Sequence, residues 1–427
     1  MEKYKLGEIA TVEISGVDKK IKDGEKKIRL CNFVDVYYNW AITIAQHDSF
    51  MPATARPNEI SKFQLRKGQV ALTKDSETRD DIGISTYIAD DFDDVILGYH
   101  CALITPQRNI LDGSYLNAIL HTKYAKKYFA CNASGSGQRY ALSVEALNSF
   151  PIPKIPLSEQ KRIGEIFSSL DKKIELNRRI NQNLEAMAKQ LYDYWFVQFD
   201  FPDENGRPYK ASGGKMVWND KLKREIPEGW NTAFVKDIAA TYSGGTPKST
   251  NAEYYDNGKI PWINSGELNS SIITKTTNYI TESGLNNSSA KLYPCNSILV
   301  AMYGATAGKV SLLTFEACSN QAVCGVMPII DEMLFYVYLY ISSLYNHFIT
   351  LSTGSARDNI SQDTIKNILL PLPTNKIAKE FNKRIRCLYQ MMINNCQEMD
   401  ILTKQRDELL PLLMNGQVSV NSDLSDD

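Results

Sequence analysis

Residues 111–156 read LDGSYLNAILHTKYAKKYFACNASGSGQRYALSVEALNSFPIPKIP, and the pattern of this stretch returns once more in the chain. Residues 331–373 read DEMLFYVYLYISSLYNHFITLSTGSARDNISQDTIKNILLPLP. In both, an aromatic-rich helical run precedes a Gly-Ser turn, an Arg, a Ser, a short helix and a Pro-x-Pro exit. Features that recur in a fixed order indicate an internal repeat. The sequence therefore predicts two similar halves, in which Arg139 corresponds to Arg357 and Ser143 to Ser361.

A long helical pattern follows each Pro-x-Pro exit. Apolar residues recur at three- and four-residue spacing over 163–195 and again over 377–413. Each pattern covers about 35–40 residues, or roughly 55–60 Å at 1.5 Å per residue. An apolar strip of this length needs a partner helix, and the other copy is the natural one. We expect two antiparallel coiled-coil helices, with Asn177, Asn181 and Asn395 fixing their register at some cost in stability.

These patterns predict the organisation of the chain. Short β runs alternate with turns in both halves, as at 69–73, 94–104, 297–302 and 323–329, which favours small mixed α/β domains. The expected class is α/β (α+β), a tandem pseudo-two-fold repeat of two such domains separated by the two helices. The predicted boundaries are a first domain at 1–157, a helix at 158–199, a connecting loop at 200–229, a second domain at 230–373, a helix at 374–415 and a tail at 416–427.

Composition excludes several classes of protein. The 427 residues carry 48 Lys and Arg against 49 Asp and Glu, and 43% are hydrophobic. A mostly disordered chain and a protein that covers DNA with an unbroken cationic surface are both excluded. Local basic patches for nucleic acid remain open. Eight scattered cysteines without a C-x-x-C, together with four histidines, argue against a disulfide scaffold or a structural zinc site.

The compartment is expected to be the cytoplasm. The first residues, MEKYK, are charged and do not resemble a signal peptide. Residues 333–351 have about the length of a membrane span. However, they include Asn346 and His347, and the equivalent run in the first half carries His121 and several lysines. A soluble amphipathic helix explains both copies, so we expect no membrane association.

The usual signatures of catalysis are missing. Residues 304–310, GATAGKV, have three residues instead of four between the glycines and end in Val where a Mg²⁺-binding hydroxyl is needed, so a tight turn between strands is expected. The sequence contains no G-x-S-x-G, no H-E-x-x-H and no Asn/Asp-Pro-Pro-aromatic tetrapeptide. The four histidines (His47, His100, His121 and His347) fall at non-equivalent places, which favours surface or packing roles. The sequence predicts two scaffolds without a reaction centre.

The chain resembles the specificity (S) subunits of type I restriction–modification systems. The resemblance covers nearly the whole sequence and rests on several fragments in order. They are PLSEQKRI at 156–163, NRRINQNLE at 177–185, YWF at 194–196, FDFP at 199–202, IPEGW at 226–230, SGGTPK at 243–248, IPWI at 260–263 and LLPLLMNG at 409–416. The second helix departs from the pattern, because Thr374-Asn375-Lys376 replaces the Leu-Ser-Glu-Gln start of the first, and Cys387, Cys396 and Arg406 interrupt its regularity.

The resemblance implies a non-catalytic subunit. Such proteins have two target recognition domains, each reading one half of a split double-stranded DNA sequence, held apart by two long antiparallel helices. They assemble with two methyltransferase (M) subunits, which use S-adenosylmethionine to methylate adenine. With restriction (R) subunits, which hydrolyse ATP in the presence of Mg²⁺, the complex cleaves unmodified DNA. The chain itself is expected to hold no cofactor and no metal.

Physical reasoning points to the loops that would read DNA. Side chains with donor and acceptor forks at groove-facing turns give direct readout. One pair of equivalent turns carries Gln138, Arg139 and Tyr140 against Arg357, Asp358 and Asn359. A second pair, after equivalent strands, carries Lys74, Asp75, Ser76 and Arg79 against Tyr303, Thr306 and Lys309. A third candidate is Gly245, Thr246 and Lys248, in a turn expected to present backbone amides. We expect Lys248 and Lys309 to contact phosphates, and Gln138, Arg139 and Arg357 to read bases.

Rigid helices between two readers would act as a ruler that sets the unread gap between half-sites. The helix exits are more apolar than one two-helix seam needs, which predicts a docking surface for M subunits. The residues expected there are Leu191, Tyr194, Trp195, Phe196, Leu409, Leu410 and Leu413. Two other functions remain open from the residues alone. They are a coiled-coil adaptor that joins two protein-binding domains without nucleic acid, and an enzyme with an unrecognised site at the junction of the two units.

Overall fold

The computed structural model describes residues 2–135, 139–353 and 360–414. The chain forms two compact units, and each contains part of both long helices. The first comprises Met1–Glu175 and Asp400–Asp427, and the second comprises Leu176–Met399. The candidate residues Gln138, Arg357 and Asn359, with Asp358, lie outside the described residues, as does the tail from residue 415.

The first unit is built on a five-stranded sheet with the order β2-β10-β6-β8-β4. Its central strand β6 is buried at every position, because it pairs with neighbours on both sides and carries the apolar sequence VALT. A three-stranded sheet, β5-β3-β9, packs beside it. The strands are β2 (Ala10–Ile14), β3 (Lys26–Cys31), β4 (Ala41–Ile42), β5 (Met51–Ala55), β6 (Val70–Thr73), β8 (Ser85–Ile88), β9 (Val95–Leu97) and β10 (Cys101–Pro106).

Smaller elements of the first unit surround these sheets. Strands β1 (Lys3–Lys5) and β13 (Pro151–Pro153) pair with each other, and β7 (Asp75–Ser76), β11 (Ser134–Gly135) and β12 (Tyr140–Ala141) form the sheet β11-β12-β7. The helices are α1 (Leu6–Ile9), α2 (Phe33–Tyr38), α3 (Pro57–Phe63), α4 (Gly113–Leu120), α5 (Lys123–Asn132) and α6 (Val144–Asn148).

The second unit repeats this topology. Its five-stranded sheet has the order β17-β24-β21-β22-β19, and its three-stranded sheet has the order β20-β18-β23. In both units the last strand of the larger sheet, β4 or β19, is parallel to its neighbour, whereas the other pairs are antiparallel. The strands are β17 (Ala239–Ser243), β18 (Ile260–Ile263), β19 (Ile272–Ile273), β20 (Tyr279–Ile280), β21 (Ile298–Ala301), β22 (Val310–Leu313), β23 (Cys318–Ser319) and β24 (Val323–Pro328). The two-copy organisation expected from sequence is confirmed.

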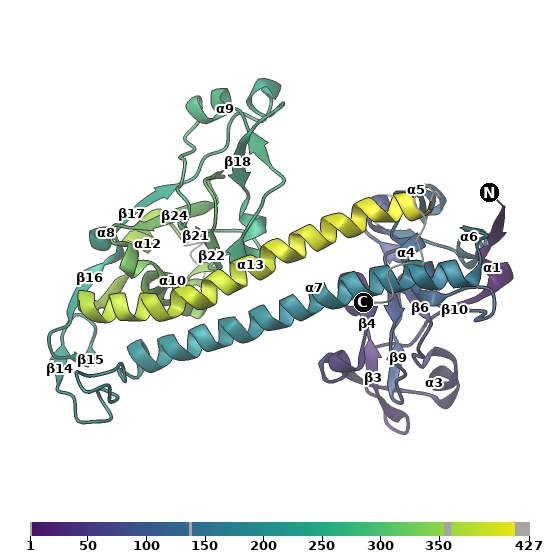
Figure 1. Ribbon diagram of the computed structural model, residues 1–427, viewed down its shortest axis with the longest axis horizontal. Coiled ribbons are helices and arrows are strands. Elements are labelled where there is room, and N and C mark those ends of the chain that lie inside the picture. Colours follow the sequence, from purple (N-terminus) through teal and green to yellow (C-terminus); the bar gives the residue numbers. More distant parts are fainter. Residues whose placement is uncertain (1, 136–138, 354–359, 415–427) are drawn as a thin grey trace, which may run out of the picture. The chain divides into compact units, whose positions relative to one another are not determined.

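The helices of the second unit follow the same order. They are α8 (Val235–Ile238), α9 (Glu282–Asn286), α10 (Leu334–Ser343), α11 (Tyr345–Thr353) and α12 (Gln362–Lys366), and β16 (Asn231–Phe234) pairs with β25 (Leu369–Leu372). Helix α10 lies against β22 and β24 (Figure 1). Residues 304–310 form the expected turn between two strands, where Gly304 and Gly308 adopt positive φ angles.

Three sequence-based expectations need correction. The run 94–104 forms two strands in different sheets, β9 and β10, because the chain turns at His100, whose φ is 69°. Each aromatic-rich run forms two helices instead of one, and in the first copy Thr122 caps the second of them through a hydrogen bond from the Ala125 amide.

Among the described residues, no helix is long and apolar enough to cross a membrane.

The third correction concerns residues 200–229, which were expected to be a connecting loop. They contain an antiparallel hairpin of β14 (Met216–Asn219) and β15 (Arg224–Pro227). The hairpin is anchored by aromatic side chains at the ends of the segment, where the Phe201 and Trp230 rings stack with centroids 5.4 Å apart. Aromatic burial of this kind stabilises a segment whose Gly and Pro content suggested a loop.

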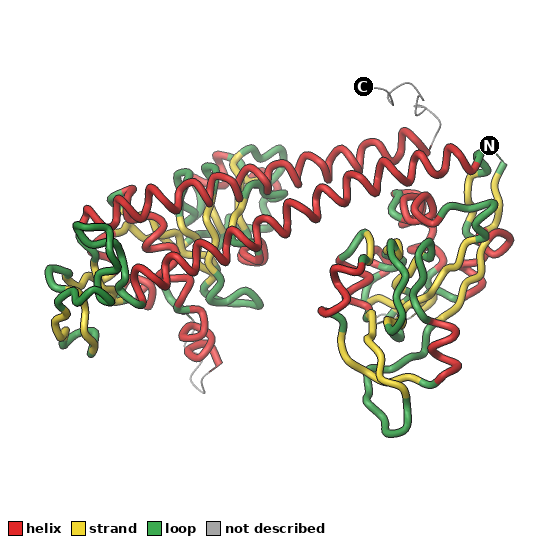
Figure 2. The backbone as a smooth tube through the Cα atoms, turned by 60° about the horizontal axis from the view of Figure 1, so that its bottom comes forward, coloured by secondary structure: helices red, strands yellow, loops and turns green. Residues whose placement is uncertain are grey.

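The two long helices are α7 (Leu157–Tyr192), which ends in a π-helical turn at Asp193–Val197, and α13 (Asn375–Met414). Within the second unit their segments run side by side and antiparallel (Figure 2). Asn181 donates to the Met392 carbonyl at 3.2 Å and accepts from Asn395 at 2.8 Å, while Asn177 donates to Glu398 at 2.7 Å. The asparagines therefore lie in the seam as expected, each with a partner across it.

Candidate nucleic-acid interface

Five of the candidate residues in the first unit come together around the small sheet β11-β12-β7. They are Lys74, Ser76, Arg79, Arg139 and Tyr140. Strand pairing places Tyr140 opposite Ser76. The guanidinium of Arg79 lies over the Tyr140 ring, with its central carbon 5.0 Å from the ring centroid. Segments more than sixty residues apart in the sequence thus present two arginines and a lysine at one edge of the unit.

The buried carboxylate of Asp75 organises this cluster. Lys74 donates to Asp75 Oδ1 at 2.8 Å, and His100 Nδ1 contacts Asp75 Oδ2. Burial raises the pKa of the Asp75 carboxyl, but the hydrogen bonds from Lys74 and His100 outweigh burial and hold the pKa below its ordinary value of 3.8. Asp75 is therefore ionised at neutral pH, and it fixes the cations around it.

The cluster borders a groove of about 650 Å³. Its other wall is helix α2, which is held in place where the Tyr37 hydroxyl donates to Asp81 at 2.7 Å. This hydrogen bond, together with burial, raises the pKa of Tyr37 to about 12. Val34 and Tyr38 of the same helix are 56% and 74% exposed. The groove therefore combines Arg139 with polar and apolar groups and with the carboxylates of Asp75, Glu77 and Asp81. Arginine and polar side chains are types that contact phosphates and base edges.

The second unit presents fewer of its candidates at the surface. Thr306 is only 3% exposed, and its hydroxyl donates to the Ser265 carbonyl at 2.8 Å. This hydrogen bond stabilises the turn that contains Thr306. Lys309 donates to the Asn269 side chain at 2.6 Å, and Tyr303 is half-buried against the core. Lys248 is exposed. Of the candidates in the second unit, Lys248 and Lys309 are the cations, and no contact brings them together among the described residues.

The turn at 243–248 differs from the expectation that it presents backbone amides. The amides of Gly244 and Gly245 donate to the carbonyls of Val323 and Ser319 at 2.9 and 2.8 Å. A Cβ added at Gly244 would lie 2.1 Å from the Asn320 carbonyl oxygen. These glycines therefore permit close backbone packing. Thr246 and Lys248 are the exposed residues of the turn, and the Thr246 hydroxyl donates to the Gln321 side chain.

Two residues of these sites were missed from sequence. His100 and Gln321 both lie in the turn that precedes the strand next to the centre of the five-stranded sheet, β10 or β24. In the first unit His100 contacts Asp75 and Arg139, and in the second Gln321 contacts Thr246. The two turns are recognisable as equivalent only through the shared topology, because neither the residue types nor the neighbouring sequences match.

The expected partner surface at the helix exits requires a correction. Trp195 and Phe196 are 3% and 2% exposed and belong to the core of the second unit, where Phe196 packs against Tyr336 and Phe381. The surplus of apolar residues is thus taken up within the chain. Tyr194 remains 37% exposed, and Leu191 is half-buried. Leu409 packs against the core of the first unit. The side chains of Leu410 and Leu413 lie outside the described part of the structure.

With this geometry established, comparison with known proteins gives the family. The family model of the type I restriction modification DNA specificity domain matches residues 1–186 and 227–397. The chain belongs to the family of type I restriction–modification specificity subunits. The two matched segments contain the five- and three-stranded sheets of both units and most of both long helices.

This specificity subunit is similar to curated relatives over most of its length. It is 28% identical over 410 residues to the HindI specificity subunit of Haemophilus influenzae, covering 84% of this chain and 88% of the relative. It is also 28% identical over 322 residues to the MjaIX specificity subunit of Methanocaldococcus jannaschii, covering 73% and 72% of the two chains.

A solved structure agrees on the fold of the specificity subunit. The crystal structure of a type I restriction–modification S subunit from M. genitalium superposes with a TM-score of 0.56 at 15% identity, covering 96% of this chain and 95% of the other. The expected fold class, mixed α/β domains combined with long helices, is confirmed.

Proposed function

We propose that this specificity subunit reads a bipartite double-stranded DNA sequence, each α/β unit contacting one half-site. The observation that supports it most is the duplication itself. The same sheet topology occurs twice, and in each copy the turn before the strand next to the sheet centre brings polar side chains to one edge. In the first copy His100 of this turn contacts Asp75 and Arg139, and in the second copy Gln321 of this turn contacts Thr246. Such groups supply phosphate contacts and base-edge readout.

Under this proposal the chain is not itself an enzyme. Two M subunits bring S-adenosylmethionine for adenine methylation, and R subunits bring ATP hydrolysis with Mg²⁺. Among the described residues, no group of three or more His, Cys, Asp or Glu side chains could hold a metal ion. The near balance of 48 cations and 49 anions fits a reader whose partners contribute much of the affinity for DNA.

For the M subunits we propose a docking surface on the flank of α7 in the second unit. Leu176 and Met187 are each 54% exposed, and Tyr194 is also exposed. They are spaced by eleven and seven residues, close to three and two whole helical turns, so they lie along one side of the helix. Large apolar side chains aligned on an exposed flank indicate a protein contact. Leu176, Met187 and Tyr194, called here the exposed stripe on α7, take the place of Trp195 and Phe196 in the proposed docking surface, because Trp195 and Phe196 are buried.

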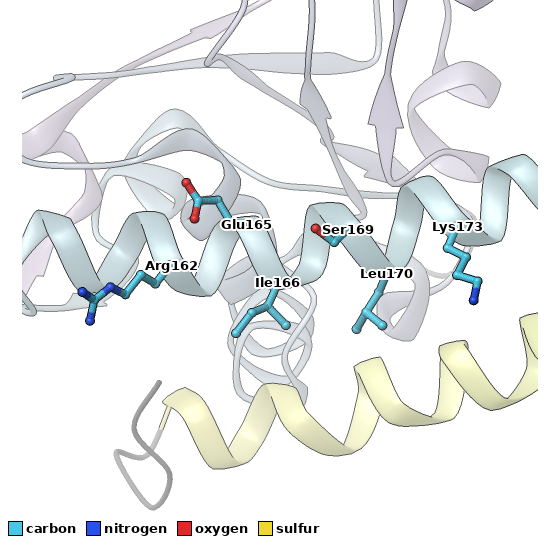
Figure 3. A pocket seen from close by; sticks show the side chains of 6 residues that line it. All are labelled: Arg162, Glu165, Ile166, Ser169, Leu170 and Lys173. Carbon is cyan, nitrogen blue, oxygen red and sulfur yellow. The ribbon is translucent and has the colours of Figure 1, made fainter. Parts of the chain in front are cut away.

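A second docking surface lies on the part of α7 in the first unit. A cavity of about 490 Å³ is lined by this helix, with Ile166 and Leu170 directed toward α13 and with Arg162 and Lys173 at the rim (Figure 3). An apolar floor within a charged rim is the usual composition of a protein interface. We propose that the two surfaces, both on the first long helix, each take one M subunit.

The test is to co-express the chain with the methyltransferase subunit encoded beside it and to sequence the genomic DNA for methylated adenine. We expect a split motif with a fixed gap. Exchanging residues 1–157 for those of another specificity subunit should change one half of the motif and leave the other half intact. An unmodified genome, together with no DNA binding by the purified complex, would refute the proposal.

A further inference from the structure

His100 occupies a backbone conformation that an L-residue rarely adopts. Its φ of 69° lies in the left-handed region, where a non-glycine residue is strained. The equivalent position of the second unit is Ala322, since each residue's carbonyl accepts a hydrogen bond from the amide that follows the equivalent strand, at 2.9 Å from Lys74 and at 2.8 Å from Met302. The turn itself therefore does not require a histidine. A strained backbone position suggests that the side chain it carries has a role, and the contacts of the imidazole indicate which.

The imidazole joins an anchored carboxylate to an exposed guanidinium. Asp75, whose side chain is 11% exposed, accepts from His100 Nδ1, and Arg139 Nη2 lies 3.0 Å from each ring nitrogen of His100. A carboxylate can only accept and a guanidinium can only donate, so the contact with Asp75 fits a histidine that carries its proton on Nδ1. The direct distance from Arg139 to Asp75 is 3.9 Å. The arginine is thus held by two groups at once, and 63% of its side chain remains exposed.

An arginine held in this way is prepared for bidentate recognition. A free Arg side chain carries about 2 kcal/mol of rotamer entropy, part of which is lost on every binding event. Fixing the side chain beforehand reduces that cost. Five N–H donors in a planar fork allow Arg139 to contact His100 and still present two donors to the O6 and N7 acceptors of guanine. Arg79, which lies over Tyr140, has no comparable carboxylate anchor among its described contacts.

We infer that Asp75 and His100 are positioning residues that orient Arg139 for a bidentate contact with a guanine in the half-site read by the first unit. The inference rests on the proposed DNA-reading function and makes it specific to one base and one side chain. A phosphate contact by Arg139 is the competing possibility. A phosphate contact and a base contact have different consequences when they are lost. Losing a phosphate contact weakens binding to all DNA sequences about equally, whereas losing a base contact relaxes the base preference at one position.

The test uses the assembled complex of this chain with its methyltransferase subunits. Binding is measured by fluorescence anisotropy on duplexes that carry the methylated motif, and on duplexes with each single base-pair change in the first half-site. The variants are Arg139→Ala, Asp75→Asn and His100→Asn. Asparagine tolerates the left-handed conformation of residue 100, so the last variant removes the imidazole without adding strain. His347→Asn, at an exposed histidine of the second unit, is the matched control.

We expect Arg139→Ala to reduce discrimination about 5- to 150-fold at one guanine position, the range for a bidentate contact. His100→Asn and Asp75→Asn should reduce discrimination at the same position by a smaller factor. Preference in the second half-site and the thermal midpoint of His100→Asn should stay as in the parent, as should all properties of His347→Asn. Unchanged base preference in His100→Asn, or equal weakening on every duplex, would overturn the inference. A parent complex without any sequence preference would instead refute the proposed function.

Discussion

His121 lies at the end of α4 in the first unit, in surroundings that favour its neutral form. Its ring stacks on Trp40 with centroids 4.2 Å apart, and Nε2 donates to the Ser85 carbonyl at 2.8 Å. Burial lowers the pKa of the imidazole to about 3, and the hydrogen bond to Ser85 opposes this only in part. A neutral histidine held in this way makes the free energy of unfolding depend on pH.

Whether the free energy of unfolding rises or falls with pH follows from the pKa of His121 in the unfolded and in the folded chain. The unfolded chain takes up a proton at His121 near pH 6.5, whereas the folded chain does so only near pH 3. Between these values the unfolded state binds more protons, so stability falls as the pH falls through 6.5. The loss is at most about 1.4 kcal/mol per pH unit, and we expect about 1–2 kcal/mol by pH 5 because the residue retains some surface.

The measurement is urea unfolding of the parent and of His121→Gln at pH 7 and at pH 5. Glutamine can keep a donor near Ser85 but does not titrate, so its stability should change less between the two pH values. An equal change in the parent and the variant would show that His121 does not contribute to the pH dependence.

Sequence reasoning named some residues of the candidate site and did not name others, for a physical reason. Arg139 and Lys74 were found because the repeat placed them in turns at equivalent positions. His100 was missed because its contacts, to Asp75 and Arg139, lie 25 and 39 residues away in the chain. Thr306 fits the pattern equally well, yet it is buried, and exposure at a turn is decided by packing that the sequence does not display.

Among the elements, the long helices were predicted best. Their 3–4 spacing predicted helices at 158–199 and 374–415, and the structure has α7 at Leu157–Tyr192 and α13 at Asn375–Met414. The partner of each apolar face was less predictable. Trp195 and Phe196 are apolar in excess of a two-helix seam, but the second unit's own aromatic residues bury them. Periodicity shows that a face is apolar without showing what covers it.

The exposed stripe on α7 should be required for binding of the M subunit. We expect Leu176→Glu combined with Met187→Glu to abolish co-purification of the M subunit, because two charges would be buried in an apolar contact. Both residues are more than half exposed, so the thermal midpoint of the isolated chain should change by only a few degrees at most. Pull-down of a tagged M subunit measures the effect.

Ala186→Glu is the control for this experiment. Ala186 is exposed on the same helix but lies about 100° around the axis from Met187, and both alanine and glutamate favour helix. This variant should retain the M subunit. Retention by the double variant as well would place the docking surface elsewhere.

At the scale of the whole molecule, the tandem repeat explains both the topology and its divergence. Recognising the repeat predicted that both units share one fold, and the strand orders β2-β10-β6-β8-β4 and β17-β24-β21-β22-β19 agree element by element. The pairing of those strands could not be read from the sequence, because it depends on contacts between distant segments. The contacts seen in the turns at the sheet edge differ between the units, His100 with Asp75 and Arg139 in the first and Gln321 with Thr246 in the second.

The same duplication predicts how the accepted DNA gap responds to helix length. Helix α7 contributes residues to both units, as does α13. If the helices set the distance between the two readers, inserting four residues into each adds about 6 Å at 1.5 Å per residue. Because successive base pairs are about 3.4 Å apart, we expect the unread gap of the methylated motif to grow by one or two base pairs.

The insertion belongs in α7 after Lys172 and at the facing level of α13, with an identical helix-forming sequence in both, so that the apolar seam stays continuous. Sequencing methylated adenine in cells that carry the variant complex measures the gap. Both half-site sequences should remain those of the parent, since no residue of the sheet-edge turns changes. A matched pair of four-residue insertions in the tail after residue 415 should leave the gap unaltered. An unchanged gap in the helix variant, with methylation retained, would show that the spacing is set by something other than the length of these helices.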